Sequence, residues 1–222
     1  MNDEKVFDLS EYLEDDTICL ENLKIQNCRI DGLCSEWAKK ELVITNCIFE
    51  HVTFDNHCGR GYVRMEGSEF TDCTFHDTLG SGKLEVEECT FTKCAFKNIS
   101  ISGVGISILW KCHFAECDFC NVDLKWHFAI YGLEMNGGKI ENTSIATCSI
   151  TEIKMSDMRL EHVRLCGGLK QNRMESVVFR DVFLEGSMGE ERSGKENQFI
   201  NCDMDGFSFQ EGGELGLESL AI

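Results

Sequence analysis

Apolar side chains recur along this chain at every fifth residue. The longest uninterrupted run has seven of them: Met135, Ile140, Ile145, Ile150, Met155, Leu160 and Leu165. A second small or apolar side chain stands two places before each, and the other three positions of each pentad are mostly polar. A helix would repeat its apolar stripe about every 3.6 residues, and a half-buried strand would alternate about every 2. The pattern therefore predicts neither of these elements.

The same frame continues through most of the chain, which gives thirty central apolar positions in all. Outside the long run they are Leu20, Ile25, Ile30, Ile44, Phe49, Phe54, Met65, Phe70, Phe75, Val86, Phe91, Phe96, Ile101, Leu109, Phe114, Phe119, Leu124, Met174, Phe179, Leu184, Phe199, Met204 and Phe209. The frame is broken at 31–41, 55–61, 76–83, 102–106, 125–132 and 185–196. We expect corner loops at these breaks.

A pentad with two inward and three outward side chains describes a short extended piece followed by a tight bend. Four such pieces close a square coil, and successive coils pair like strands about 4.8 Å apart. The absence of proline agrees with this, because proline would remove a donor from a ladder that has partners on both sides. We therefore predict an all-β fold, a parallel β-helix. An antiparallel β-sandwich, the alternative, would give alternation instead of fives.

The predicted domain organisation has three parts. Residues 1–16 are predicted to form an acidic N-terminal cap, with a short helix starting at Ser10. Residues 17–210 form the single β-helix domain. Residues 211–222, which contain several leucines, are predicted to form a C-terminal cap or a dimerisation element.

The stretches FTDCTF (Phe70–Phe75), CTFTKCAF (Cys89–Phe96) and CHFAECDF (Cys112–Phe119) resemble the pentapeptide-repeat family. That resemblance implies a right-handed quadrilateral β-helix in which the central Leu or Phe and the small residue two places earlier point inward. It also implies a homodimer through the C-terminus. Some members of the family are acidic rods that protect or inhibit type II topoisomerases.

Nine of the fourteen cysteines occupy the small inward position of a pentad. They are Cys28, Cys47, Cys73, Cys89, Cys94, Cys112, Cys117, Cys148 and Cys202. Cysteine there behaves as a compact hydrophobic residue. One C-x-x-C pair occurs, Cys117 and Cys120, but the frame points the first inward and the second outward, which opposes joint metal binding. We predict reduced thiols in a cytoplasmic protein, without metal or disulfides.

No catalytic constellation is recognisable. The six histidines share no motif, His51 and His162 fall on outward positions, and sequences such as HExxH, GxSxG and the P-loop are missing. We therefore predict no catalytic, cofactor-binding or metal-binding residues, and no enzyme. The least favoured alternative, a β-helix enzyme acting on a polysaccharide, would need two carboxylates about 5–9 Å apart.

The net charge is −18, and its distribution matters more than its sum. Residues 1–16 carry −6 and residues 185–222 carry −7, which leaves only −5 for the residues between them. This charge disfavours direct binding of nucleic acid. No apolar run approaches the about 20 residues of a membrane helix, so we expect no membrane contact.

The function that we predict is a non-enzymatic protein-binding module, an inhibitor or protector that acts through a rigid β-helix surface. The alternative is an acidic DNA mimic that binds a DNA-processing protein such as a type II topoisomerase. A continuous acidic stripe along one face would favour mimicry, whereas acidic residues confined to the ends would disfavour it.

Overall fold

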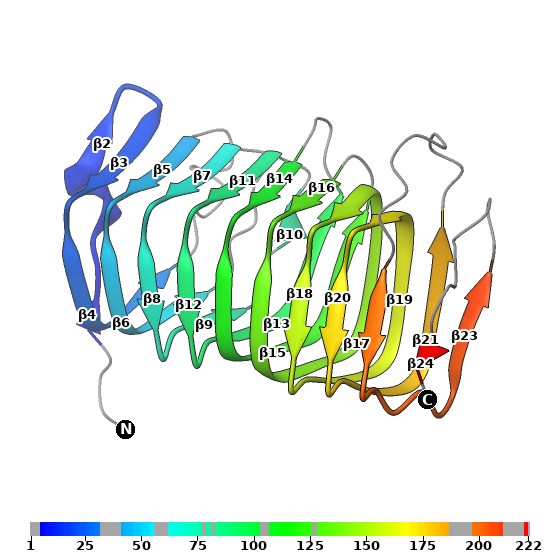
Figure 1. The fold of residues 1–222 in the computed structure, drawn as a ribbon. Coiled ribbons are helices and arrows are strands. Elements are labelled where there is room, and N and C mark those ends of the chain that lie inside the picture. The colour runs from blue at the N-terminus through cyan, green and yellow to red at the C-terminus, as the bar shows by residue number, and fades with distance from the viewer. Residues whose placement is uncertain are drawn as a thin grey trace.

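The computed structural model shows a single rod of stacked parallel coils (Figure 1). It describes residues 5–31, 41–55, 62–76, 79–80, 83–102, 107–125, 128–186, 197–210 and 220–221. All pairings between coils are parallel, and one short antiparallel hairpin, β2 with β3, lies at the N-terminal end of the described chain. The predicted all-β, β-helix fold is therefore confirmed.

The strands are short where the chain turns a corner after each pentad and long where the corner keeps strand geometry. Their bounds are β1 Lys5–Val6, β2 Leu13–Glu14, β3 Thr17–Glu21, β4 Lys24–Asp31, β5 Glu41–Thr45, β6 Ile48–Asp55, β7 Tyr62–Glu66, β8 Glu69–Thr71, β9 Thr74–His76, β10 Leu79–Gly80, β11 Lys83–Glu87, β12 Thr90–Thr92, β13 Ala95–Ser102, β14 Ser107–Trp110, β15 His113–Lys125, β16 Phe128–Tyr131, β17 Glu134–Thr151, β18 Lys154–Ser156, β19 Arg159–Lys170, β20 Arg173–Glu175, β21 Val178–Gly186, β22 Gln198–Ile200, β23 Phe207–Gln210 and β24 Leu220–Ala221.

Four columns of central side chains define four faces of the rod. The first face is built around Ile25, Phe49, Phe70, Phe91, Phe114, Met135, Met155 and Met174. The second is built around Ile30, Phe54, Phe75, Phe96, Phe119, Ile140, Leu160 and Phe179. The third contains Ile101, Leu124, Ile145, Leu165 and Leu184. The fourth contains Leu20, Ile44, Met65, Val86, Leu109, Ile130 and Ile150.

Phenylalanines fill the interior between the first two faces over residues 48–120, which we call the aromatic half. On the first face, the Phe49, Phe70 and Phe91 rings stack with centroids 4.9 and 4.7 Å apart. On the second face, the Phe54 and Phe75 rings stack at 4.5 Å. The two stacks meet edge to face, an arrangement that aromatic quadrupoles favour. The stacking spacing matches the strand spacing, so rings and backbone share one repeat.

The small inward positions of the aromatic half hold thiols that bond to the backbone of the preceding coil. Cys47 donates to the carbonyl of Leu20 at 3.3 Å, and Cys94 donates to that of Phe70 at 3.4 Å. Seven of the nine predicted cysteines are fully buried, Cys202 is partly buried, and the side chain of Cys148 lies outside what the structure describes. The prediction that these thiols act as compact core residues is confirmed for those seven.

From residue 133 to residue 174, which we call the aliphatic half, the packing changes. The central positions of the first two faces hold Met135, Ile140, Met155, Leu160 and Met174. The positions two places earlier hold larger side chains than before, such as Leu133, Ile153 and Met158.

Gly138 stands at the change between the two halves, in register with Cys117. It has φ +82°, and a Cβ there would lie 2.0 Å from the carbonyl oxygen of Cys117. Only glycine therefore fits at this corner.

The corners of the coils adopt the left-handed conformation. Twenty non-glycine residues of the described chain have φ between 49° and 58°. All except Asp15 and Gln171 lie two places after a central residue, as Asn98 does after Phe96, and Gln171 lies two places after Leu169, which is in register with the central Ile150. Eleven of the twenty are Asn or Asp, the types that tolerate this region best, but Glu88, Lys93 and Lys111 adopt it as well. This corner requirement was not predicted.

Two expectations need correction. The helix expected from Ser10 is a single 3-10 turn, η1, at Leu9–Tyr12, capped by the Asp8 side chain. The chain then forms the β2–β3 hairpin, because Leu13 and Glu14 pair with the edge of the first coil. The expected loops at 76–83 and 125–132 are also partly wrong: β10 lies in the first, and β16 with the buried Ile130 lies in the second. Ile130 follows Leu124 by six residues and precedes Met135 by five, so it extends the long run of central residues by one position.

Other predictions fall on residues that the structure does not describe. These include most of the expected corner loops and the C-terminal element at 211–222, of which only β24 is described.

Candidate protein-binding face

The fourth face carries a cluster of outward apolar side chains on two adjacent strands. In β14 and β16, Leu109 and Ile130 point into the core, so their neighbours point outward. The strands pair Ile108 with Ala129 and Trp110 with Tyr131. These four outward residues, which we call the apolar patch, therefore form a two-by-two block on the surface.

The large side chains of the patch are accessible. Tyr131 is 39% exposed, and Ile108 and Trp110 are half-buried. Lys111 places its Nζ 4.4 Å from the centroid of a Trp110 ring, a cation–π contact. The described residues include four Tyr and Trp side chains. Three of them, Tyr62, Trp110 and Tyr131, belong to β7, β14 and β16 of this face, whereas Tyr12 lies elsewhere and stacks on Phe7.

Carboxylates lie beside the patch on the two preceding coils. Glu85 is in register with Ile108, and Glu87 is in register with Trp110. We call Glu66, Glu85, Glu87 and Glu88 the acidic rim. Arg64 pairs with Glu66 at 2.8 Å and Lys111 with Glu88 at 3.6 Å, whereas no described cation lies within ion-pair distance of Glu87.

Polar contacts fix the ionisation of the rim. Burial opposes the charge of Glu85, but the Lys83 ammonium and the Tyr62 hydroxyl outweigh it and lower the pKa of this carboxyl. Burial and the bond to Glu85 raise the pKa of Tyr62 to about 12, so Tyr62 stays protonated and donates to Glu85. A hydrogen bond to Glu152 raises the pKa of Tyr131. Three rim carboxylates are thus matched by cations, Glu66 by Arg64, Glu85 by Lys83 and Glu88 by Lys111, and Glu87 is the rim carboxylate without a described counter-charge.

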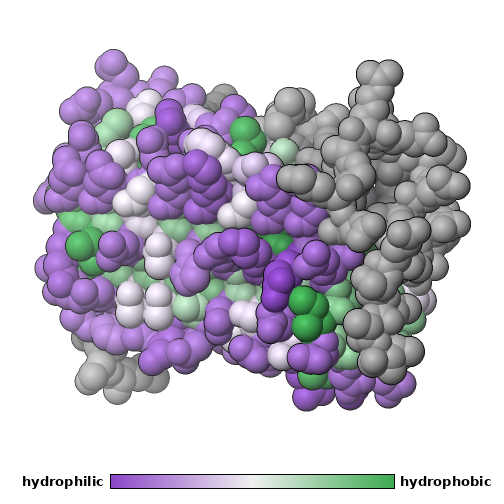
Figure 2. Space-filling view, viewed as in Figure 1, coloured by the Kyte–Doolittle hydropathy of each residue, from purple (hydrophilic) through white to green (hydrophobic). Residues whose placement is uncertain are grey.

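The first face, by contrast, is mainly hydrophilic. Its outward positions in the aromatic half include Glu69, Thr71, Thr90 and Thr92. Figure 2, seen from the side of β8, β12, β18 and β20, shows hydrophilic residues over most of the coloured surface, with paler and hydrophobic residues between them. Ile48, 38% exposed, is the one outward side chain of this face among the large exposed hydrophobics of the described chain.

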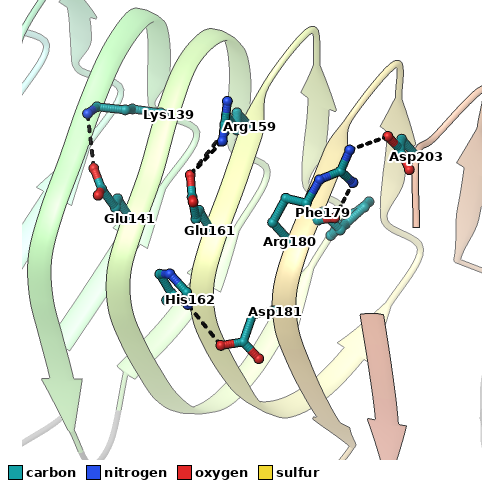
Figure 3. A network of polar contacts seen from close by, with 9 residues as sticks. All are labelled: Lys139, Glu141, Arg159, Glu161, His162, Phe179, Arg180, Asp181 and Asp203. Carbon is teal, nitrogen blue, oxygen red and sulfur yellow. Dashed lines mark hydrogen bonds and ion pairs between the residues drawn. The ribbon is translucent and has the colours of Figure 1, made fainter. Parts of the chain in front are cut away.

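Charges on the second face are neutralised in pairs. Lys139 binds Glu141 at 3.0 Å and Arg159 binds Glu161 at 2.9 Å, each within its own strand (Figure 3). Arg180 bridges to Asp203 of the next coil at 2.6 Å. No outward column of the described faces is acidic over more than two successive coils. The continuous acidic stripe that DNA mimicry requires is therefore missing from the described faces.

The structure places the other residues considered from the sequence far from any common site. His51 and His162 are exposed; His162 lies 2.8 Å from Asp181 at a corner (Figure 3). Cys117 is buried and Cys120 is half-buried, as the frame predicted. Within the described residues, no group of three His, Cys, Asp or Glu side chains is placed to hold a metal ion. No helix among them is long and apolar enough to cross a membrane.

The patch itself was missed by the sequence analysis. The signal was present, because Ile108, Trp110 and Tyr131 are apolar at the outward positions next to a central residue, which are usually polar in this chain. The broken frame at 125–132 concealed Tyr131. Trp110 and Tyr131 are brought together by the pairing of β14 with β16 in successive coils, which the period of five does not reveal.

No protein-family model and no curated protein sequence matches this chain. Among solved structures, a trypsin-treated variant of QnrB1, a plasmid-mediated fluoroquinolone resistance protein, aligns with a TM-score of 0.49 and 13% identity over 86% of this chain and 90% of that one. HetL, a pentapeptide repeat protein involved in heterocyst differentiation regulation from the cyanobacterium Nostoc sp. strain PCC 7120, aligns with a TM-score of 0.29 and 9% identity over 84% of this chain and 87% of that one.

The register between coils decides the fold. Residues two places apart, such as Cys89 and Phe91, both enter the core, and the same pair recurs in each coil of the aromatic half. The fold is a β-solenoid of stacked parallel coils with four faces, and the patch lies on the fourth face.

Proposed function

We propose that this chain is a non-enzymatic protein-binding module, an inhibitor or protector that binds its partner through the fourth face. The observation that supports this is the gathering of outward Tyr and Trp side chains on that one face. Tyr and Trp are enriched where protein interfaces concentrate their binding energy, because they bury a large area at little entropic cost.

The rigidity of the rod supports the same proposal. Each coil of the described chain is hydrogen-bonded to the coils before and after it, and stacked side chains fill its interior. Trp110 and Tyr131 are therefore held in place before a partner arrives. A surface that needs no ordering on binding loses less entropy and binds more tightly.

The experiment is affinity capture from the native host, followed by mass spectrometry, with wild type and two variants. Tyr131→Ser removes the exposed ring of the patch, and Ile48→Ser removes a side chain of equal exposure, 38% against 39%, on the first face. We expect a partner that is captured by wild type and Ile48→Ser and lost with Tyr131→Ser. Equal capture by both variants would contradict the proposal, and thermal unfolding confirms that both remain folded.

The alternative implied by the family resemblance, a DNA mimic that binds a type II topoisomerase, has a separate test. Paired charges on the body of the rod do not favour it. A gyrase supercoiling assay at micromolar protein should therefore show no effect. Inhibition or protection that persists in Tyr131→Ser would favour mimicry over the patch.

A further inference from the structure

We infer that the segment recognised by the apolar patch carries a cationic side chain, arginine in particular, set among apolar residues. This inference rests on the proposed function and adds the chemistry of the partner. The patch supplies two aromatic rings in register, and the residue paired with Trp110 on the preceding coil is Glu87. Rings and a carboxylate side by side attract a cation that is flanked by apolar surface.

Trp110 already binds a cation from within the chain. Lys111 lies over this ring, and its charge is matched by Glu88 at 3.6 Å. Glu87 belongs to the same strand edge but contacts no cation within the described side chains. An incoming guanidinium therefore finds a carboxylate that the described side chains leave without a counter-charge, next to an aromatic surface.

A second carboxylate lies on the other side of the patch. Tyr131 is in register with Thr151, and Glu152, the next residue, hydrogen-bonds to the Tyr131 hydroxyl. The patch is thus bracketed along the rod by Glu87 and Glu152. Arginine suits this arrangement better than lysine, because its planar group stacks on rings while it donates two parallel hydrogen bonds to a carboxylate.

The same charges argue against other occupants. A second copy of this chain docked by two-fold symmetry would bring patch against patch and Glu87 near the Glu87 of the other copy, and like charges repel. A nucleic acid would bring its phosphates to Glu87, which repels them. A basic and apolar segment of another protein is complementary to both the rings and Glu87.

The test uses a phage-displayed library of random twelve-residue peptides, selected on the full chain and counter-selected on Tyr131→Ser. We expect the selected peptides to share an Arg or Lys next to apolar residues. For such a peptide, Glu87→Gln should weaken binding about fivefold, the upper range for an exposed ion pair. The matched control is Glu69→Gln, an exposed glutamate of the first face, which should change nothing.

The outcomes separate this inference from the proposed function. Selected peptides without a cation, no selected peptides at all, or unchanged binding by Glu87→Gln would overturn the inference. The inference would also be overturned if the wild-type protein sediments as a dimer and the Tyr131→Ser variant sediments as a monomer. If host capture still depends on Tyr131 in those cases, the protein-binding function stands and only the cationic partner is refuted. Loss of that dependence refutes both.

Discussion

The aromatic half and the aliphatic half fill the same cross-section with different side chains. In the aromatic half, Phe at the central positions of the first two faces accompanies a small residue two places earlier, as in Cys89 and Phe91. In the aliphatic half, Leu133 stands two places before Met135. Leu133 is larger than the cysteine at the equivalent position of the aromatic half, and Met135 is narrower than the phenylalanine. The strand spacing fixes the size of each coil, and interiors pack near crystal density. In these two pairs, a larger side chain at one inward position therefore accompanies a smaller one at the other, whereas Gly138 and Ile140 at the junction form a smaller pair.

The junction of the two halves should be the most sensitive point of the rod. Gly138→Ala places a Cβ 2.0 Å from the Cys117 carbonyl oxygen at a φ of +82°. We expect a loss of more than about 3 kcal/mol in the free energy of unfolding, measured in urea by circular dichroism.

Gly132→Ala is the matched control for that junction. It has φ +65°, but its Cβ would meet Lys111 Cγ at 3.4 Å, an ordinary contact. It should cost about 1 kcal/mol. If Gly138→Ala and Gly132→Ala lose the same free energy of unfolding, the close contact at Gly138 does not constrain the junction of the two halves.

A swap of one inward pair tests volume conservation directly. Cys89→Leu and Phe91→Met convert one aromatic coil to the pair found in Leu133 and Met135. Each single change should cost about 1–3 kcal/mol, through overpacking and through a cavity respectively. The double variant should cost at least about 1 kcal/mol less than the sum. Additive losses would show that the two halves obey separate packing rules.

Alkaline pH should weaken the aromatic half first. Burial raises the pKa of Cys89 to about 12 and that of Cys112 to about 11. Unfolded thiols ionise near pH 8.5. The folded state therefore retains protons that the unfolded state has released, and the stability present below pH 8.5 is lost as pH rises toward 11 and 12.

The expected loss is about 2 kcal/mol per thiol at pH 10, because pH 10 lies about 1.5 units above the unfolded pKa and each unit is worth about 1.4 kcal/mol. Urea midpoints at pH 7 and pH 10 measure it, and Cys89→Ala should flatten the decline. Cys19→Ala, which removes an exposed thiol, should leave the decline as in wild type. A decline that Cys89→Ala does not alter would assign the pH dependence to other groups.

The corners give the smallest effect. In the aromatic half, Glu88, Lys93 and Lys111 hold the left-handed conformation at a steric cost. Lys93→Asn should therefore stabilise the fold by about 0.5–1 kcal/mol, as measured by thermal unfolding. The reverse change, Asn27→Lys at φ +51°, should destabilise it by a similar amount. No difference between them would show that these corners store no strain.

The interior of the fold could be predicted from the sequence, because the period of five marks each inward position and about four pentads close one coil. The ladder from Phe49 through Phe70 to Phe91 confirms it. Ile130 was missed because it follows Leu124 by six residues, although it lies five residues before Met135 and so in the frame of the long run. The left-handed corners escaped because Glu, Lys and His share those positions with Asn and Asp.

The candidate face was harder to predict than the core. Period analysis finds residues that point inward, whereas Trp110 and Tyr131 point outward and come together only through the register of β14 and β16. A search for apolar residues beside central positions would have found Ile108 and Trp110. It would not have placed Glu87 beside them, since that requires the pairing of β11 with β14.

The parallel ladder makes the length of the molecule adjustable. Phe49, Phe70 and Phe91 succeed each other at intervals of 21 residues, and each stacks on the phenylalanine of the coil above or below. Duplicating one such block in the gene would add one coil, about 4.8 Å along the rod, without changing the packing of the other coils. Because this block lies before Trp110, the distance from the N-terminal end to Trp110 would grow by that one step. The number of coils therefore sets the distance between two points on the rod, in increments of one coil.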